Sequence, residues 1–293
     1  MSLNDFLTKY KPLIDQAIEE ELARRLKEAE EISPEIVKVI KAMQELSVGG
    51  KRLRGLLTIL GYGLSGGEVN DEIIKAAMVM ELFHLGLLIQ DDVMDRDNLR
   101  RGVKTIHARY TDTHLGESLA MCAGDLTFGW GMEILATISI STINVNNAMK
   151  VWGKYFARVG YGQMLDVSKV ADEQTLLSIL NLKSGEYSCV LPLVLGATLG
   201  GASQELKDAL TKYGMELGIV FQLRDDYLAE YGDSEKTGKP VGNDRREGKK
   251  TLATMYGQAR LEEEIKKHWE EGKKFAKNEV MRELLEWMAT REN

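Results

Sequence analysis

The sequence predicts a nearly all-α protein, a single-domain bundle of antiparallel helices, and two observations support this fold class. Only 4 prolines occur in 293 residues, and proline is the residue that most disfavours a helix interior. No stretch has the convincing period-two alternation of a half-buried strand. The sequence also contains no linker-like or low-complexity segment and no repeat of fixed period. Residues 1–293 are therefore expected to form one domain.

Helices in the first half are recognised by apolar residues at helical spacing and by the residues that begin them. The first contains Phe6 and Tyr10 on one face. Ser33 is placed as the N-cap of the second, with Pro34 in its first turn. Gly124 is unusual inside a helix and indicates close packing against a neighbour. The expected segments are Leu3–Glu30, a helix from Pro34, Leu56–Leu64, Asn70–Met94 and a helix that Asp112 or Thr113 caps.

The second half continues the helical pattern with one interruption. Lys183, Ser184 and Gly185 break the spacing of apolar residues. A basic residue beside small ones marks either a kink that lines a cavity or plain surface, and the sequence leaves both open. Charge alternation in the last two helices indicates an exposed face. The expected segments are Val145–Val167, Thr175–Leu199, Met215–Leu223, Thr251–Gly272 and Phe275–Thr290.

Composition and charge exclude several classes of protein. The chain is 44% hydrophobic and 28% charged, which is ordinary for a soluble globular protein with a large core. A formal net charge of −7 argues against nucleic acid as the main partner. Cys122 and Cys189 are too few for a disulfide framework or a zinc site. Without a signal peptide or an apolar run long enough to span a bilayer, a soluble, reducing, cytoplasmic setting is expected.

The chain is organised around an apolar helical run that ends in aspartates. Asp91 and Asp95 lie one helical turn apart, so their carboxylates point the same way, and Asp92 shares that edge. Such carboxylates at the end of a buried helix repel each other unless a cation lies between them. Mg²⁺ suits this role because it prefers oxygen ligands and combines one or two carboxylates with water and substrate phosphates.

A second acidic motif, with Asp225 and Asp226, follows another apolar helical run. A solvated acidic helix end is the simpler interpretation of either motif alone. Two such motifs, each followed by basic residues, favour a different arrangement. The two helix ends are expected to face each other across one cavity and to hold a cluster of divalent ions.

Basic residues complement these aspartates, and together they suit a diphosphate. Metal ions held by the aspartates chelate diphosphate oxygens, while Lys and Arg neutralise the remaining charge and stabilise a departing diphosphate. The apolar helical wall suits a hydrocarbon substrate whose carbocation must be shielded from water. Two separate basic clusters indicate two diphosphates. The basic residues are Lys51, Arg54, Arg100, Arg101, Lys183, Lys239 and Lys249.

In these motifs the chain resembles the trans-isoprenyl diphosphate synthases, or polyprenyl synthetases, over almost its whole length. The matching elements are Gly50-Lys51-Arg52-Leu53-Arg54, Asp91-Asp92-x-x-Asp95 with Arg100-Arg101-Gly102, Gln222-x-x-Asp225-Asp226 with Gly232-Asp233, and a lysine loop from Gly238-Lys239 to Gly248-Lys249. The resemblance implies the isoprenoid synthase fold around a central deep cavity, a homodimer, and Mg²⁺, roughly three ions per active site, with Mn²⁺ as a substitute. It also implies head-to-tail condensation of isopentenyl diphosphate with an allylic diphosphate (dimethylallyl, geranyl or farnesyl) to an all-trans prenyl diphosphate.

The family's residue roles carry over to the matched positions as expectations. Catalysis is assigned to Asp91, Asp95, Lys183 and Asp225. Mg²⁺ is expected to contact Asp91, Asp95 and Asp225, with Asp92 and Asp226 in support. The allylic diphosphate is expected at Arg100, Lys183, Ser184, Gln222 and Lys239. Isopentenyl diphosphate is expected at Lys51, Arg54, His84 and Arg101, with Lys249 nearby. The diphosphate leaving group is the expected base for the final proton loss.

Three positions depart from the family pattern. Ala229 stands where the second motif usually has a third aspartate, and activity is expected to survive because metal contact there comes mainly from the first aspartate. Ser184 replaces the commoner threonine and keeps the hydroxyl. Gln90 replaces a frequent histidine, and the sequence does not account for it.

The resemblance also indicates the product length. Residues one helical turn apart upstream of Asp91 line the tunnel floor, namely Gly86 with Leu87 beside it, then Phe83, then Met80. Short-product relatives carry an aromatic residue at the position of Gly86, so glycine is expected to leave the tunnel open there. Phe83 lies about 4.5 Å deeper at the helical rise, about one isoprene unit. A product of geranylgeranyl length or somewhat longer is predicted. The alternative is that Phe83 faces the core and a neighbouring helix sets the length.

Three other classes of protein share part of this pattern. A class I terpene cyclase shares the first motif but does not need Lys51 and Arg54 for a second diphosphate. A di-iron bundle would use Glu81-x-x-His84, but no other histidine has glutamate three residues earlier. A non-catalytic subunit of a heteromeric prenyl synthase usually loses the aspartates, which remain here. The synthase is therefore favoured.

Overall fold

The computed structural model describes residues 1–170, 172–232 and 251–292, and this part of the chain is almost entirely helical. Two short strands, β1 (Leu99–Arg100) and β2 (Val103–Lys104), form an antiparallel hairpin. The all-α prediction is confirmed. Lys239 and Lys249 lie outside the described residues.

Two helices begin at capping residues that were expected from the sequence. The Ser33 hydroxyl accepts a hydrogen bond from the Glu35 N–H, and the Asp112 carboxylate accepts one from the Leu115 N–H. The helices are α1 (Leu3–Ile32), α2 (Pro34–Ser47), α3 (Leu53–Leu64), α4 (Asp71–Asp95), the 3₁₀ turn η1 (His107–Arg109), α5 (Thr113–Thr137), α6 (Thr142–Val167), α7 (Glu173–Ile179), the π-helix η2 (Leu180–Val190), α8 (Leu191–Leu199), α9 (Gln204–Tyr231), α12 (Leu252–Tyr256), α13 (Gln258–Lys273) and α14 (Glu279–Thr290).

One segment differs from the expected continuous helix, and in another the expected interruption is confirmed. The stretch Thr251–Gly272 breaks at Gly257, whose φ of 74° cannot belong to a right-handed helix. The stretch Thr175–Leu199 divides into α7, η2 and α8. Lys183, Ser184 and Gly185 lie inside the π-helix, where the Ser188 hydroxyl donates to the Lys183 carbonyl. π-Helical turns often occur at functional sites.

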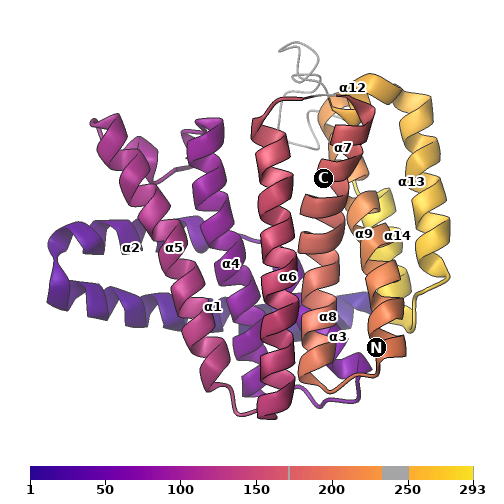
Figure 1. Cartoon of the computed structure of the whole chain (residues 1–293), viewed down its shortest axis with the longest axis horizontal. Helices are drawn as coiled ribbons and strands as arrows, with labels where there is room; N and C mark the ends of the chain where they lie inside the picture. The colour runs from indigo at the N-terminus through magenta and orange to yellow at the C-terminus, as the bar shows by residue number, and fades with distance from the viewer. Residues whose placement is uncertain (171, 233–250, 293) are drawn as a thin grey trace.

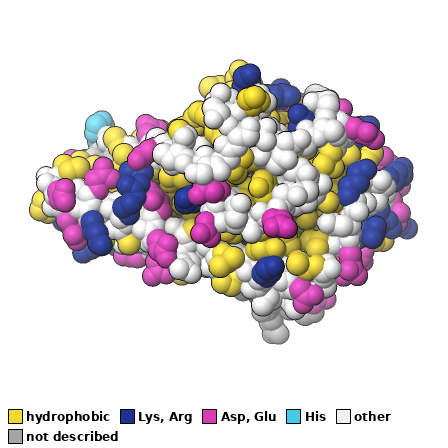
Figure 2. Space-filling view, turned by 90° about the horizontal axis from the view of Figure 1, so that it is seen from below, with side chains coloured by type: hydrophobic (Ala, Val, Ile, Leu, Met, Phe, Trp, Pro, Cys, Tyr) yellow, Lys and Arg dark blue, Asp and Glu magenta, His cyan; other side chains and the backbone are white. Residues whose placement is uncertain are grey.

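Figure 1 shows how the long helices are arranged. Helices α4, α6, α8, α9 and α13 stand roughly upright, and α1 crosses behind them to form a hairpin with α2 at one side. Helix α1 packs against α3, α4 and α14. Seen from below, charged side chains cover the α1–α2 end, whereas hydrophobic side chains gather toward the middle (Figure 2). The buried apolar residues of the upright helices α4, α6, α8, α9 and α13 belong to one hydrophobic core.

Helix α4 lies at the centre of this interior and packs most closely on α5. A Cβ atom added to Gly124 of α5 would lie 2.7 Å from Gln90 Cγ, and Gln90 Nε2 donates to Asp125 Oδ1 at 3.0 Å. The predicted close packing at Gly124 is confirmed, and it gives Gln90 a structural role. No helix of the described ranges combines the length and apolar character that crossing a bilayer requires.

Candidate active site

The two acidic motifs meet at η2, which connects them through two consecutive residues. Lys183 Nζ lies 3.8 Å from Asp91 Oδ1, at the C-terminal end of α4. The next residue, Ser184, donates its hydroxyl to Gln222 Oε1 of α9 at 3.1 Å. Gln222 Nε2 in turn donates to Asp226 Oδ1 at 2.9 Å. The ends of α4 and α9 therefore lie on the same side of the molecule and open onto one site.

Two glycines bring α9 close enough to η2 for these contacts. A Cβ atom on Gly218 of α9 would lie only 2.2 Å from the Ser184 carbonyl oxygen. A Cβ atom on Gly185 would meet Met215 at 2.9 Å. Any larger residue at Gly218 would push α9 away and separate Ser184 from Gln222.

The first motif carries more negative charge than its neighbours neutralise. Burial raises the pKa of the Asp92 carboxyl, and only one of its oxygens is paired, accepting from Arg100 Nε at 2.6 Å. Asp92 Oδ2 is buried and has no hydrogen-bond partner within the described ranges. Burial, together with the charges of Asp91 and Asp166, raises the pKa of Asp95. The end of α4 therefore presents crowded carboxylate oxygens that a cation would stabilise.

Two residues that the sequence analysis did not assign hold this motif in place. Gln163 Nε2 of α6 donates to Asp91 Oδ1 at 2.6 Å. Asp166, one turn later, pairs with Lys183 Nζ at 2.6 Å. Gln163 and Asp166 are three residues apart near the end of α6, so they share one helix face, and this spacing is the feature of the sequence that could have identified them. The hydrogen bond from Gln163 fixes the rotamer of Asp91 and leaves its second oxygen for a ligand.

The carboxylate oxygens at the end of α4 fit Mg²⁺ better than a metal ion that is held by protein ligands alone. Within the described part of the chain, no three His, Cys, Asp or Glu side chains come together closely enough to hold a metal by themselves. Mg²⁺ usually takes one or two carboxylates and completes its shell with water and substrate phosphates. The orphaned Asp92 Oδ2 and the crowded Asp91 and Asp95 match that pattern.

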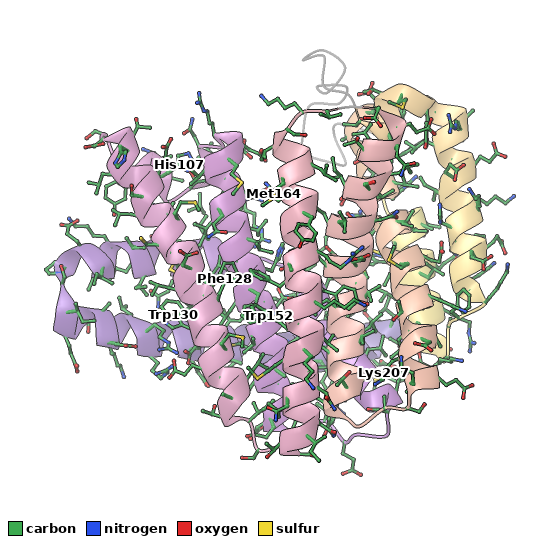
Figure 3. The ribbon with its side chains drawn as sticks, in the orientation of Figure 1. His107, Phe128, Trp130, Trp152, Met164 and Lys207 are labelled. Atoms are coloured by element: carbon green, nitrogen blue, oxygen red, sulfur yellow. The ribbon has the colours of Figure 1, made fainter. Side chains whose placement is uncertain are left out.

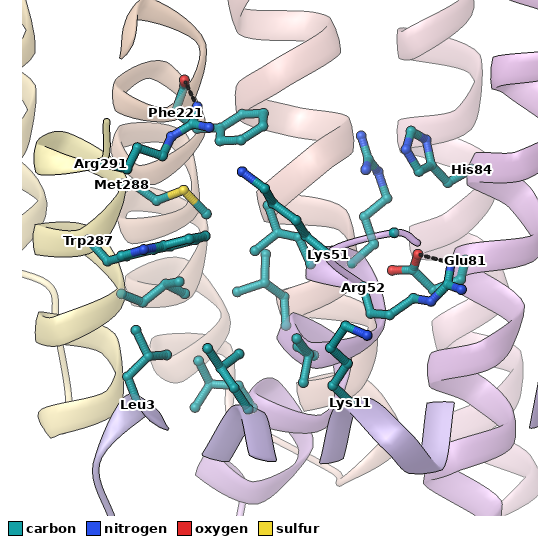
Figure 4. Close-up of a pocket in the computed structure, with 18 of the residues that line it drawn as sticks. Leu3, Lys11, Lys51, Arg52, Glu81, His84, Phe221, Trp287, Met288 and Arg291 are labelled. Atoms are coloured by element: carbon teal, nitrogen blue, oxygen red, sulfur yellow. Dashed lines mark hydrogen bonds and ion pairs between the residues drawn. The ribbon is translucent and has the colours of Figure 1, made fainter. Parts of the chain in front are cut away.

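A cavity of about 770 Å³ opens beside the acidic ends and is rich in cations (Figure 4). Six of the predicted substrate-binding residues line it together with Asp225 of α9: Lys51, Arg54, His84, Arg100, Arg101 and Gln222. Lysine and arginine side chains outnumber the carboxylates Glu81 and Asp225 in this lining, which is typical of an anion-binding site.

Burial and mutual repulsion shift the pKa values of these basic groups downward. The pKa of Lys51 is lowered by burial and by the Arg291 charge, and that of Arg101 by burial and by Arg52 and Arg100. Burial and the nearby arginines hold the pKa of His84 well below its ordinary value. His84 is therefore neutral near pH 7 and offers a hydrogen bond rather than a charge.

Arg291 is a further cation of this cavity, and sequence analysis did not identify it. Its guanidinium donates to Asp225 Oδ1 at 2.6 Å and to the Phe221 carbonyl at 3.1 Å. It lies over the Phe221 ring at 4.7 Å (Figure 4). Arg291 closes α14, whose charge alternation had indicated only an exposed face.

The lower part of the cavity is apolar and is built by three helices that are distant in sequence. Its lining comes from the first turns of α1, from α3 and from α14, with Trp287 and Leu3 facing it in Figure 4. The cavity therefore combines a cationic rim with a hydrocarbon-like wall, as an amphiphile with an anionic head requires.

The predicted chain-length residues lie away from this cavity, on another face of α4. Phe83 is fully buried, and Leu87 is half-buried. Gly86 faces α5, and a Cβ atom there would lie 2.0 Å from Thr127 Oγ1 and 2.9 Å from the Gly124 carbonyl oxygen. The expectation that Gly86 leaves a tunnel open is therefore wrong, because Thr127 occupies that space. Gly86 instead permits close packing of α4 on α5.

Comparisons with known proteins agree with this geometry. The family model described as "Polyprenyl synthetase" matches residues 37–288. A short chain isoprenyl diphosphate synthase from Methanocaldococcus jannaschii is 35% identical over 245 residues, covering 82% of this chain and 73% of the relative. A geranylfarnesyl diphosphate synthase from Aeropyrum pernix is 36% identical over 219 residues, which cover 72% of this chain and 67% of the relative. A similar solved structure is the crystal structure of a geranylgeranyl pyrophosphate synthase from Corynebacterium glutamicum complexed with isoprenyl diphosphate and magnesium. It superposes with a TM-score of 0.82 at 25% identity, over 94% of this chain and 98% of the relative.

Proposed function

The chain belongs to the polyprenyl synthetase family, and from that membership and the geometry of its site we propose the reaction that it catalyses. It is a prenyltransferase that condenses isopentenyl diphosphate with an allylic diphosphate, head to tail, to an all-trans prenyl diphosphate of geranylgeranyl length or somewhat longer. One observation carries the proposal. Lys183 and Ser184 connect two acidic helix ends beside a cavity with a cationic rim.

Mg²⁺ is the proposed metal, and the residues that would hold it are Asp91, Asp92 and Asp95 of α4 with Asp225 and Asp226 of α9. When bound, Mg²⁺ stabilises the negative charge that develops on the departing diphosphate. The relative crystallised with magnesium and isoprenyl diphosphate supports this assignment.

The cations of the chain divide between two diphosphates. Arg100, Lys183, Ser184 and Gln222 lie against the acidic ends and would orient the allylic diphosphate for ionisation. Lys51, Arg54, His84 and Arg101 line the neighbouring cavity and would hold isopentenyl diphosphate. This places the nucleophilic double bond beside the allylic carbon, and the apolar walls exclude the water that would quench the carbocation. The released diphosphate is the nearest base for the final proton.

A homodimer is proposed from the hydrophobic side chains that α5 and α6 leave in solvent. Both helices lie at the front in Figure 1. Their exposed large hydrophobic residues are Leu115, Met121, Leu126, Ile143, Tyr161 and Met164. Several exposed apolar residues on adjacent helices are typical of a subunit interface. Sedimentation equilibrium should give a dimer that the variant Leu126→Asp weakens.

The experiment that tests the reaction is incubation with Mg²⁺, isopentenyl diphosphate and each of dimethylallyl, geranyl and farnesyl diphosphate. Chain lengths are read from the dephosphorylated products. Asp91→Ala and Asp225→Ala should lower turnover by at least about a hundredfold, whereas Asp208→Ala, on the exposed start of α9, should not. Hydrocarbon formed from an allylic diphosphate alone would favour a class I terpene cyclase, and no product at all would reject the proposal.

A further inference from the structure

Ser188 of η2 makes two hydrogen bonds, and they connect residues of the two proposed diphosphate sites. Its hydroxyl oxygen accepts from Arg54 Nη2 at 2.6 Å, and Arg54 lines the cavity proposed for isopentenyl diphosphate. The same hydroxyl donates to the Lys183 carbonyl at 2.9 Å, and the Lys183 side chain lies beside Asp91 at the allylic site. Ser188 is only 5% exposed, so water does not readily replace either bond.

The π-helix makes this double contact possible. In an α-helix a serine hydroxyl bonds the carbonyl three or four residues earlier, as Ser178 does with Gln174. Ser188 instead bonds the carbonyl five residues earlier, which is the spacing of a π-helical turn. A serine hydroxyl has one hydrogen to donate. Since Lys183 accepts that hydrogen, the Ser188 oxygen presents its lone pairs to Arg54 and acts there as an acceptor.

Close helix packing holds α3 at the distance from η2 that this contact needs. A Cβ atom on Gly61 of α3 would overlap the Leu193 carbonyl oxygen of α8. One on Gly196 of α8 would overlap the Thr58 carbonyl oxygen of α3. Because α8 continues from η2 without a break, the first turn of α3, which carries Arg54, is fixed relative to the π-helix.

Helix α6 holds η2 from another side. Figure 3 labels Trp152 and Met164 on this helix, which packs against η2. A Cβ atom on Gly162 of α6 would lie 3.0 Å from Lys183 Cγ, so little room remains between the two segments. Lys183 is therefore held by packing on α6 as well as by its hydrogen bond from Ser188.

Arg54 has few other contacts that could set the orientation of its guanidinium. Its Nη2 donates to Ser188, whereas its Nε is buried without a hydrogen-bond partner in the described part of the chain. Its Cζ lies 4.9 Å from the centroid of the Tyr187 ring, a cation–π contact that stabilises the charge but does not fix where the N–H groups point. A guanidinium binds phosphate oxygens best when two parallel N–H groups face them. The bond to Ser188 therefore determines how well Arg54 can bind a diphosphate.

We propose that Ser188 is a positioning residue that orients Arg54 toward the diphosphate of isopentenyl diphosphate. This inference rests on the proposed function. Ser188 acts through Arg54 rather than by contact with the substrate. Loss of its hydroxyl should therefore weaken the binding of isopentenyl diphosphate and largely spare the allylic diphosphate, because Lys183 keeps its packing on α6.

The test compares the steady-state kinetics of Ser188 variants in the condensation assay. Ser188→Ala should raise the KM for isopentenyl diphosphate about tenfold. The KM for the allylic diphosphate and the kcat should change much less. Ser188→Thr keeps the hydroxyl and should restore most of the lost affinity.

A double-mutant cycle with Arg54→Lys shows whether Ser188 acts through Arg54. Lysine has no planar guanidinium to orient, so Ser188→Ala should have little further effect on the KM for isopentenyl diphosphate in that background. Thr198→Val is the matched control. The Thr198 hydroxyl is also buried and donates to the Val194 carbonyl within α8, outside the lining of the described cavity, so this variant should keep wild-type kinetics.

An active Ser188→Ala enzyme with the wild-type KM for isopentenyl diphosphate would overturn the inference. Equal effects of Ser188→Ala in the Arg54 and Lys backgrounds would overturn it too. If circular dichroism shows that Ser188→Ala is unfolded, Ser188→Cys takes its place, because a thiol is a weak acceptor of similar size. Failure of the wild-type chain to condense the substrates would instead reject the proposed function.

Discussion

The ion pair between Arg291 and Asp225 makes a specific prediction about Mg²⁺ binding. Asp225 is a proposed Mg²⁺ ligand, yet its Oδ1 accepts from the Arg291 guanidinium at 2.6 Å. Arg291 is held firmly, because its carbonyl accepts from Arg224 Nε at 2.8 Å and its side chain donates to the Phe221 carbonyl. A metal ion that binds Oδ1 must displace this guanidinium, and one that binds Oδ2 must tolerate its positive charge nearby. Replacement by glutamine should therefore favour metal binding.

The size of the effect follows from the exposure of the pair. A hydrogen bond between charged groups contributes about 1.5–3 kcal/mol when it is buried. The Arg291 side chain is 3% exposed, but that of Asp225 is 40% exposed. Solvent screening reduces the value to about 1 kcal/mol. Since 1.4 kcal/mol is a factor of ten, Arg291→Gln should tighten Mg²⁺ binding about fivefold.

The assay is isothermal titration of MgCl₂ into the substrate-free protein at constant ionic strength. Arg282→Gln is the control, because Arg282 lies on the exposed side of the same helix and changes the net charge equally. Asp225→Asn should weaken binding. An Arg291→Gln variant with unchanged or weaker Mg²⁺ affinity would refute the competition. An Asp225→Asn variant with unchanged affinity would remove Asp225 from the metal site.

Three further measurements test the site and its packing. Burial and neighbouring arginines lower the pKa of His84 below its ordinary value of 6.5 in the folded protein. Below pH 6.5 the imidazole is therefore protonated in the unfolded state but not in the folded state. The free energy of unfolding should fall as the pH drops below that value. Urea unfolding should lose about 1 kcal/mol between pH 7.5 and 5.5 from this group, and His84→Gln should remove that loss. Gly86→Ala should destabilise the protein by about 1–3 kcal/mol through overpacking, and adding Thr127→Ala should recover part of it; equal stability of the two variants would contradict the contact. Burial raises the pKa of the Asp92 carboxyl, so the folded state is destabilised when this carboxyl is charged at pH 7.5. Asp92→Asn removes that charge and should raise the melting temperature in EDTA at pH 7.5 by about 2 °C.

Much of the fold and of the site could be predicted because their signals are local. The apolar spacing of α4 and the cap at Ser33 depend on neighbouring residues in the sequence, and both predictions are confirmed. Of the two residues expected to cap α5, Asp112 is the one that does so. The interruption at Lys183 and Ser184 was visible, but its meaning was not. Only the structure distinguishes a π-helix that connects two motifs from a surface kink.

The predictions that failed or were missed concern contacts between segments that are distant in the sequence, for which there is no local signal. Gly86 looked like open space because the sequence does not tell which residue of another helix packs there, and Thr127 lies 41 positions away. Arg291 pairs with Asp225 across 66 positions, while its local surroundings resemble an ordinary exposed helix end. The break at Gly257 was missed because an isolated glycine within a helical pattern does not by itself require a positive φ.

The charges of the site are arranged so that cations and carboxylates partly neutralise each other before any ligand binds. Arg100 pairs with Asp92, Arg291 pairs with Asp225, and Lys183 lies between aspartates. Metal alone would leave the cations unpaired, and diphosphate alone would leave the carboxylates unpaired. When both ligands bind, the carboxylates pair with Mg²⁺ and the protein cations pair with pyrophosphate. Mg²⁺ and inorganic pyrophosphate should therefore bind with positive coupling of about 1–3 kcal/mol.

Titration of each ligand separately and then together measures this coupling, after correction for magnesium pyrophosphate formed in free solution. Arg100→Gln should reduce it, because one carboxylate would then no longer need a replacement partner. The exposed Arg24→Gln variant on α1 provides the charge-matched control. Independent binding of the two ligands would mean that the pairs do not exchange, and that the proposed diphosphate-binding cations remain structural counter-ions of the aspartates.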